Sequence, residues 1–202
     1  VDVKKVVVKN SKLYVNREDG FIGTSLRREE YVEDCSDIDD IIVFTSNGDM
    51  IVTKVDSKKF VAKNILYVSV FKKRDSRTIY NMIYKEGKSG VSYIKRFNVT
   101  GVTRDKTYNL TSQNPKTKIL HFSANPNGEA EIVTIQLRQS GSIKKLKWDL
   151  DFADLAIKGR SVKGNIVSKY SVNKVIFKEK GLSTLKPRKI WFDDTVQRLN
   201  VD

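Results

Sequence analysis

Short apolar runs separated by turn residues fill most of the chain. Two pairs of runs, residues 13–15 with 21–22 and residues 41–44 with 50–52, surround Glu18-Asp19-Gly20 and Ser46-Asn47-Gly48. Asp-Gly and Asn-Gly readily adopt the positive φ angles that a type I′ turn requires. Both pairs therefore predict β-hairpins.

Three further hairpins are predicted along the chain. Their turns are Pro126-Asn127-Gly128, a looser loop from Lys85 to Gly90, and Asp193-Asp194. The flanking strands are residues 119–122 with 132–135, residues 78–84 with 91–97, and residues 189–192 with 195–199. From Gly48 to Gly90 and from Gly90 to Gly128 the step is about 40 residues, the period of propeller-like blades.

Some of these runs are apolar on both faces of the predicted strand. Examples are Ile41 to Phe44 and Ile132 to Leu137. Such strands are covered on both sides, which suggests neighbouring blades. The best helix signal, Asp151 to Ala156, supports at most a turn or two. We therefore expect an all-β fold of about five hairpin units.

Composition adds a partner to this picture. The chain has 202 residues, 39% of them hydrophobic, and 38 Lys+Arg against 24 Asp+Glu, a net charge of +14. That surplus attracts polyanions, with nucleic acid the first candidate and an acidic membrane surface the second. A basic soluble protein without a specific partner is the third alternative.

The first residues of the chain and its single cysteine and histidine indicate the expected cellular compartment. No stretch is long and apolar enough to cross a bilayer, and Val1-Asp2-Val3-Lys4-Lys5 is not a signal peptide. Without an initiator Met, we interpret the chain as a piece of a longer protein. Cys35 is the only cysteine and His121 the only histidine, so we expect a reducing cytosol and no zinc site.

Basic residues concentrate in the connections between the predicted hairpins, where blades of a propeller would place them on a curved rim. Contacts with phosphates along such a rim would need no base reading. The alternative is an ordinary solvated charged surface. The predicted DNA-binding residues are Lys58, Lys59, Lys72, Lys73, Arg74, Arg104, Lys106, Lys144, Lys145, Lys158, Arg160 and Lys163.

Catalytic and cofactor sites are not predicted. Gly159 to Gly164 is not a nucleotide-binding loop, because Asn165 follows where Lys and Ser or Thr are needed. The acidic run from Glu33 to Asp40 lacks the spacing of an EF-hand and is interpreted as a solvated loop. Cys35 has no recognisable base, and His121 is interpreted as structural. We therefore expect no cofactor, no metal and no enzyme.

Several segments resemble a known family. They are Lys12 to Gly23, Ile94 to Lys106, Ala124 to Glu131 and Ala156 to Asn165. These segments resemble the C-terminal domain of the A subunit of bacterial type IIA topoisomerases, topoisomerase IV and DNA gyrase, of the Bacteroidetes type. The resemblance extends over essentially the whole chain.

The resemblance implies a β-pinwheel, a propeller variant whose blades exchange strands, with a basic rim that wraps duplex DNA. It implies one domain over residues 1–202, with approximate blades at 11–38, 39–77, 78–116, 117–187 and 188–202. The implied partners are duplex DNA, the rest of the A subunit and, through the A subunit, the ATPase (B) subunit. The implied location is the bacterial cytoplasm, at the nucleoid. The strand-cleaving tyrosine of the family lies in another domain.

The same resemblance bears on the kind of topoisomerase. Gyrases carry a heptapeptide close to Gln-Arg-Arg-Gly-Gly-Lys-Gly, and residues 157–164 are a degenerate relative of it. Ile157 replaces the Gln and Ser161-Val162 separates the glycines, which favours topoisomerase IV. The alternative function is a propeller scaffold for protein contacts, which would require an exposed apolar patch.

Overall fold

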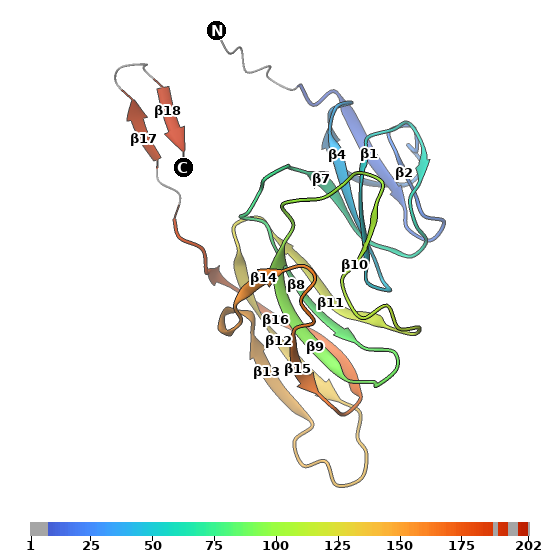
Figure 1. Cartoon of the computed structure of the whole chain (residues 1–202), viewed down its shortest axis with the longest axis vertical. Helices are drawn as coiled ribbons and strands as arrows, with labels where there is room; N and C mark the ends of the chain where they lie inside the picture. Colours follow the sequence, from blue (N-terminus) through green and yellow to red (C-terminus); the bar gives the residue numbers. More distant parts are fainter. Residues whose placement is uncertain (1–7, 188–189, 194–197, 202) are drawn as a thin grey trace.

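The computed structural model describes residues 8–187, 190–193 and 198–201, with side chains up to residue 187 (Figure 1). In this part of the chain nearly all regular structure is antiparallel β-sheet, so the all-β prediction is confirmed. The helical structure described is one 3-10 turn, η1 (Phe152–Asp154), within the short segment expected for it. No described helix is long and apolar enough to span a membrane.

The strands form a series of sheets that follow the chain order. The first sheet has the order β3 (Glu30–Cys35), β1 (Ser11–Asn16), β2 (Phe21–Gly23), β6 (Lys59–Phe60). The second has the order β7 (Ile65–Phe71), β4 (Asp40–Thr45), β5 (Asp49–Lys54), β10 (Thr107–Asn109). The third has the order β11 (Lys118–Asn125), β8 (Ile79–Lys85), β9 (Ser92–Asn98), and both β14 (Ile157–Gly159) and β15 (Asn165–Ser168) pair with β9.

The remaining strands complete the series. The fourth sheet has the order β16 (Val172–Ser183), β12 (Glu129–Leu137), β13 (Lys147–Asp151). A last pair consists of β17 (Ile190–Asp193) and β18 (Arg198–Val201), as the hairpin signal there predicted, while its turn lies outside the described residues.

Neighbouring sheets exchange strands in a regular way. After the hairpin β4–β5 the chain adds β6 to the first sheet and returns as β7. After β8–β9 it adds β10 to the second sheet and returns as β11, and after β12–β13 it adds β14 and β15 to the third and returns as β16. We call β6, β10, β14 and β15 the exchange strands. Figure 1 shows the long connection after β9 leaving its own sheet to run along the second. This exchange is the arrangement that the pinwheel resemblance implied.

The core consists of layers between successive sheets. Strand β4 is buried along its whole length: Ile41 and Val43 pack toward the first sheet, and Ile42 and Phe44 toward the third. A further cluster around Val133 and Ile135 fills the space between the third and fourth sheets. The prediction that Ile41 to Phe44 is covered on both sides is therefore confirmed.

One predicted hairpin is wrong. Gly128 adopts a φ of 68° and its amide donates to the Asn125 carbonyl, so the turn at Pro126-Asn127-Gly128 forms. It joins strands of different sheets, however, because β11 pairs with β8 while β12 pairs with β13 and β16. The third repeating unit thus ends near residue 125, and not near residue 116 as the expected blades had it. The hairpins at Gly20, Gly48 and Lys85–Gly90 are confirmed.

Candidate nucleic-acid interface

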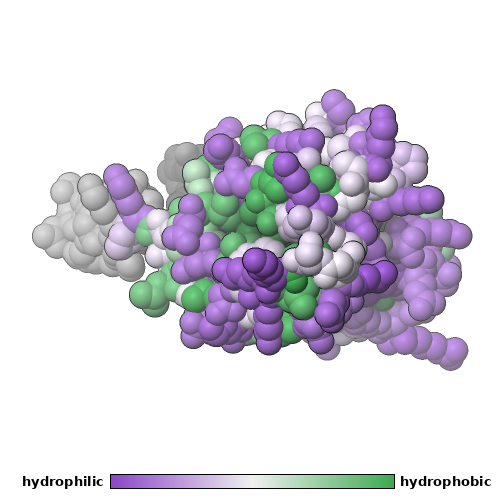
Figure 2. Space-filling model, turned by 90° about the horizontal axis from the view of Figure 1, so that it is seen from below, coloured by the Kyte–Doolittle hydropathy of each residue, from purple (hydrophilic) through white to green (hydrophobic). Residues whose placement is uncertain are grey.

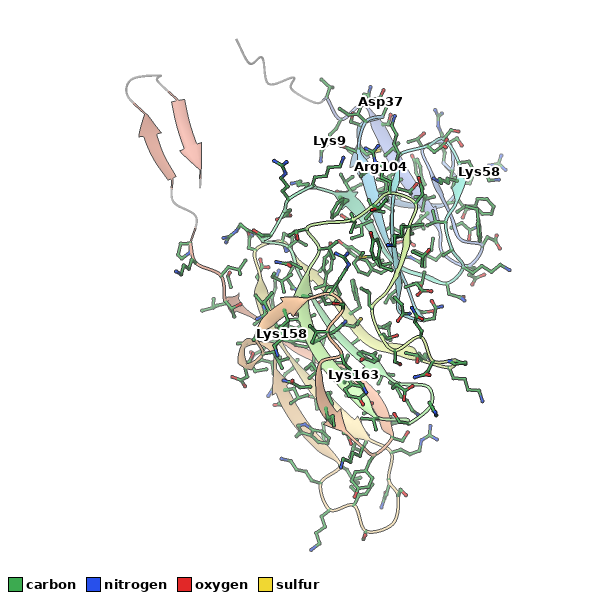
Figure 3. The ribbon with its side chains drawn as sticks, viewed as in Figure 1. Lys9, Asp37, Lys58, Arg104, Lys158 and Lys163 are labelled. Atoms are coloured by element: carbon green, nitrogen blue, oxygen red, sulfur yellow. The ribbon has the colours of Figure 1, made fainter. Side chains whose placement is uncertain are left out.

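Most of the predicted basic residues lie in the connections that carry the exchange strands, residues 55–64, 99–117 and 152–171. We call these connections the exchange segments. Figure 3 shows Lys58 and Arg104 over the upper two sheets and Lys158 and Lys163 over the lower two. The predicted DNA-binding residues that lie in the exchange segments are Lys58, Lys59, Arg104, Lys106, Lys158, Arg160 and Lys163.

Three exposed lysines of the exchange segments rest on aromatic rings. The Nζ of Lys58 lies 4.8 Å from the ring centre of Phe21, that of Lys106 lies 5.2 Å from Tyr108, and that of Lys163 lies 4.6 Å from Tyr93. Within the described part of the chain no carboxylate pairs with these lysines or with Lys158. A ring under the stem limits how far an ammonium group wanders while its charge still faces solvent.

Other cations of the same segments link one segment to the next. Lys59 donates to Asp105 Oδ1 at 2.7 Å and to Thr53 Oγ1 at 2.6 Å. Arg160 donates to the Gly101 carbonyl at 2.7 Å, with its guanidinium 4.4 Å from the Tyr108 ring centre. These contacts join the first exchange segment to the second and the second to the third. The exchange segments therefore contact one another in series.

Arg104 has a different structural partner. Its Nε donates to Oδ1 of Asp40 at 2.7 Å, and Lys73 Nζ lies 3.7 Å from the other carboxylate oxygen. Asp40 is only 5% exposed, although its acidic run was interpreted as a solvated loop. The last residue of that run is thus a buried anchor for two of the predicted DNA-binding residues.

The loop from Arg160 to Gly164 joins β14 and β15, which both pair with β9. Its interior is filled by Lys95 of β9, whose side chain is 4% exposed. Lys95 Nζ donates to the carbonyls of Leu110, Arg160 and Val162 at 2.5, 2.7 and 2.9 Å. Burial lowers the pKa of the Lys95 ammonium group to about 8. Sequence reasoning missed Lys95, since the residue reads as one more charge in a basic chain.

The remaining predicted residues lie elsewhere. Lys72, Lys73 and Arg74 are exposed in the connection between β7 and β8, along a groove of about 1200 Å³ that Arg77 and Lys9 also line. Lys144 and Lys145 are exposed in the loop of the β12–β13 hairpin. The sequence had suggested that these two lysines lie in a connection between hairpins, but they lie in the loop within one hairpin.

The single histidine and the single cysteine of the chain, which could in principle be catalytic, both lie in packed regions between sheets. His121 Nε2 lies 2.6 Å from Glu131 Oε1, and the Ser123 hydroxyl donates to the same oxygen at 2.5 Å, in a half-buried cluster between the third and fourth sheets. Cys35 is buried in the core between the first two sheets. Among the described residues no three His, Cys, Asp or Glu side chains gather as a metal site.

Comparisons with known proteins agree on one kind of domain. Residues 12–180 match the model of a family described as "Topoisomerase C-terminal domain, Bacteroidota". The chain is 30% identical over 178 residues to the A subunit of DNA topoisomerase 4 from Borreliella burgdorferi, a match that covers 88% of this chain and 26% of that protein. The chain thus spans about a quarter of that relative's length.

A solved structure, described as the crystal structure of the C-terminal domain of DNA topoisomerase IV, is similar with a TM-score of 0.49 at 11% identity. The match covers 88% of this chain and 64% of that one.

Proposed function

Because this chain belongs to the Bacteroidota family of topoisomerase C-terminal domains, we propose that it binds duplex DNA without sequence preference and bends it along the exchange segments. It is not itself an enzyme and needs no cofactor. The exposed lysines of the exchange segments contact phosphates, and the remaining predicted cations around residues 72–74 and 144–145 extend the path. The 202 residues act as one pinwheel domain, with each sheet and its exchange strand as a blade.

One observation carries this proposal: the exchange segments touch one another in series and each holds at least one exposed lysine. Lys59 meets Asp105, and Arg160 meets Gly101 and Tyr108, so the positive positions are held at fixed separations across several sheets. A rigid row of cations suits a polyanion whose charges repeat regularly. Bending a short duplex costs several kcal/mol, and additional phosphate contacts offset that cost.

The parent protein is proposed to be a type IIA topoisomerase of the topoisomerase IV kind, acting in the bacterial cytoplasm. The departures from the gyrase heptapeptide at residues 157–164 support this choice over a supercoiling gyrase. The domain would present DNA to the catalytic core of its own parent chain, and through that chain would work with the ATPase subunit.

The test is a binding series with linear duplexes of different sequence and length at several salt concentrations. We expect similar affinities for all sequences and a log K that falls with log salt by about 0.9 for each neutralised phosphate. A flat salt response, or a strong preference for one sequence, would contradict the proposal. Nicking or relaxation of supercoiled plasmid by the domain with magnesium would contradict its non-catalytic role.

A protein contact is the second candidate function. Figure 2 shows apolar side chains between charged ones at the lower end of the molecule. A pocket of about 400 Å³ is lined there by Leu137, Ile143, Trp148 and Tyr170, and Tyr170 is 59% exposed. Exposed apolar surface of this kind is typical of protein interfaces. Trp148→Ser should leave DNA affinity unchanged and weaken any association with the remainder of the parent topoisomerase.

A further inference from the structure

The strongest unexplained feature is the burial of a lysine beneath the loop from Arg160 to Gly164. An ammonium group is costly to bury unless each of its N–H groups finds an acceptor. Lys95 has three such acceptors, the carbonyls of Leu110, Arg160 and Val162, two of them in the loop. An apolar side chain would fill the same space without holding those carbonyls.

The carbonyl of Lys163 also points into the protein. It accepts a hydrogen bond at 2.7 Å from the hydroxyl of Tyr84, a fully buried residue of β8. Gly164 then returns the chain to β15 with a φ of 98°, and a Cβ there would lie 2.5 Å from the Ile94 carbonyl. The carbonyls of residues 160, 162 and 163 are therefore all turned inward.

In a trans peptide the N–H points to the side opposite the carbonyl of the preceding residue. The described chain has no cis peptide bond, so the amides of Ser161 and Lys163 point away from the Lys95 ammonium group, and the amide of Gly164 points away from the Tyr84 hydroxyl. Within the described residues none of these three amides has a hydrogen-bond acceptor. The amides of Lys163 and Gly164 are successive, and successive free amides can together bind an anion. The exposed side chains of Lys158 and Lys163 add positive charge in the same segment.

We infer that Lys95 is a positioning residue that holds the loop carbonyls inward, so that the amides of Ser161, Lys163 and Gly164 present a site for one backbone phosphate of DNA. This inference rests on the proposed function, since it names the atoms of the protein that would grip the duplex at this loop. Lys95 itself is buried and does not touch the DNA.

The protonation of Lys95 provides a signature that a purely structural role would lack. The titratable side chains that meet this loop are Tyr84, which donates to the Lys163 carbonyl, Tyr93, which lies under Lys163, and Tyr108, which lies under Arg160. Burial is the cause of the lowered pKa of Lys95, and no carboxylate contributes to it. Above pH of about 8 the neutral amine has two N–H groups for three carbonyls, so the loop loses one restraint. An ordinary lysine stays charged to about pH 10.4.

The experiment measures duplex affinity of the whole chain, by fluorescence anisotropy, one pH unit below and one above about 8. We expect the unaltered chain to bind roughly tenfold more weakly at the higher pH, and Lys95→Met to bind weakly at both, because the phosphate contact is lost. The control is Lys178→Met, which removes one charge from an exposed lysine paired with Asp149 on the fourth sheet. It should behave like the unaltered chain.

If the unaltered chain binds DNA but Lys95→Met matches the control at both pH values, the inference is wrong while the proposed function stands. If the unaltered chain does not bind DNA at all, both are wrong. Should Lys95→Met fail to fold, the amide NMR signals of Ser161, Lys163 and Gly164 in the unaltered chain decide. They should shift when a duplex is added and again as the pH passes about 8, and unmoved signals would overturn the inference.

Discussion

At the scale of single residues, the carboxylate of Glu86 organises the turn of the β8–β9 hairpin. It accepts hydrogen bonds from the Ser89 hydroxyl at 2.5 Å and from the amides of Lys88 and Ser89 at 2.9 and 2.7 Å. These bonds, with the Ser89 hydroxyl the largest cause, lower the pKa of Glu86 to about 2. Only the ionised carboxylate accepts all of them.

The stabilisation from Glu86 should therefore depend on pH in a defined direction. A depressed carboxylate pKa contributes stability that is fully present above the unfolded value of about 4.3 and is lost as the pH falls through about 2. Melting temperatures from neutral pH to about pH 2 should show a smaller acid loss for Glu86→Gln than for the unaltered chain. Parallel curves for the two proteins would contradict this prediction.

The thiol of Cys35 should be inert in the folded protein. Its side chain is 0% exposed, and burial, aided by Asp39, Glu33 and Asp34, raises its pKa. Because the thiolate is the reactive form, a thiol reagent should modify Cys35 only as fast as the protein unfolds. Addition of urea should therefore accelerate the reaction, and rapid labelling in native buffer would show that the core around it opens.

At the scale of elements, Arg96 of β9 ties the third sheet to the fourth. It is 1% exposed and donates to Asn81 Oδ1, Thr184 Oγ1 and the Gly128 carbonyl at 3.0, 3.0 and 3.1 Å. Thr184 follows β16, and Gly128 lies between β11 and β12. A single side chain thus bonds to the neighbouring strand β8 and to one end of the antiparallel β12–β16 pair, where β12 begins and β16 ends.

Arg96→Met should lower the free energy of unfolding by about 3 kcal/mol, because buried acceptors lose their charged donor. Urea denaturation measures the loss. The matched control is Arg138→Met, at an exposed position just after β12, where a change within about 0.5 kcal/mol is expected. Equal effects of the two substitutions would mean that the Arg96 contacts add nothing to stability.

The same strand illustrates what the sequence could and could not predict. Turn chemistry located the turns, because Asn-Gly and Asp-Gly act locally, but at residues 126–128 it could not say which strands pair. Exchange strands such as β10, Thr107–Asn109, are too short for a period of two to stand out. Lys95 and Arg96 point to opposite faces of β9, and only a strand covered on both sides buries both.

At the scale of the whole molecule, the position of a charge should matter more than its number. Lys158→Ala with Lys163→Ala should reduce the salt slope of duplex binding by roughly 1.8, since each lost phosphate contact contributes about 0.9. Lys12→Ala with Lys174→Ala removes the same charge from exposed positions outside the exchange segments. That control should change the slope much less, and equal slopes would mean that only net charge attracts DNA.

The net charge and its clustering could be read from the sequence, and they indicated a polyanion as the partner. The contacts between successive exchange segments, such as Lys59 with Asp105 and Arg160 with Gly101, could not be read from it. These residues are far apart in sequence, and only the strand exchange brings their segments together. For the same reason the paired role of Asp40 with Arg104 was hidden within an acidic run.

Strand exchange also constrains how the chain reaches this structure. Strand β10 pairs with β5 although β6 to β9 lie between them in the sequence, and β14 pairs with β9 across β10 to β13. Contacts of such long sequence separation slow folding, since the entropy of closing each loop is lost before the pairing forms. In a solenoid a terminal repeat can detach by itself. Here each unit holds an edge of the one before it, so we expect slow folding in one concerted step and no stable intermediate with a single repeat unfolded.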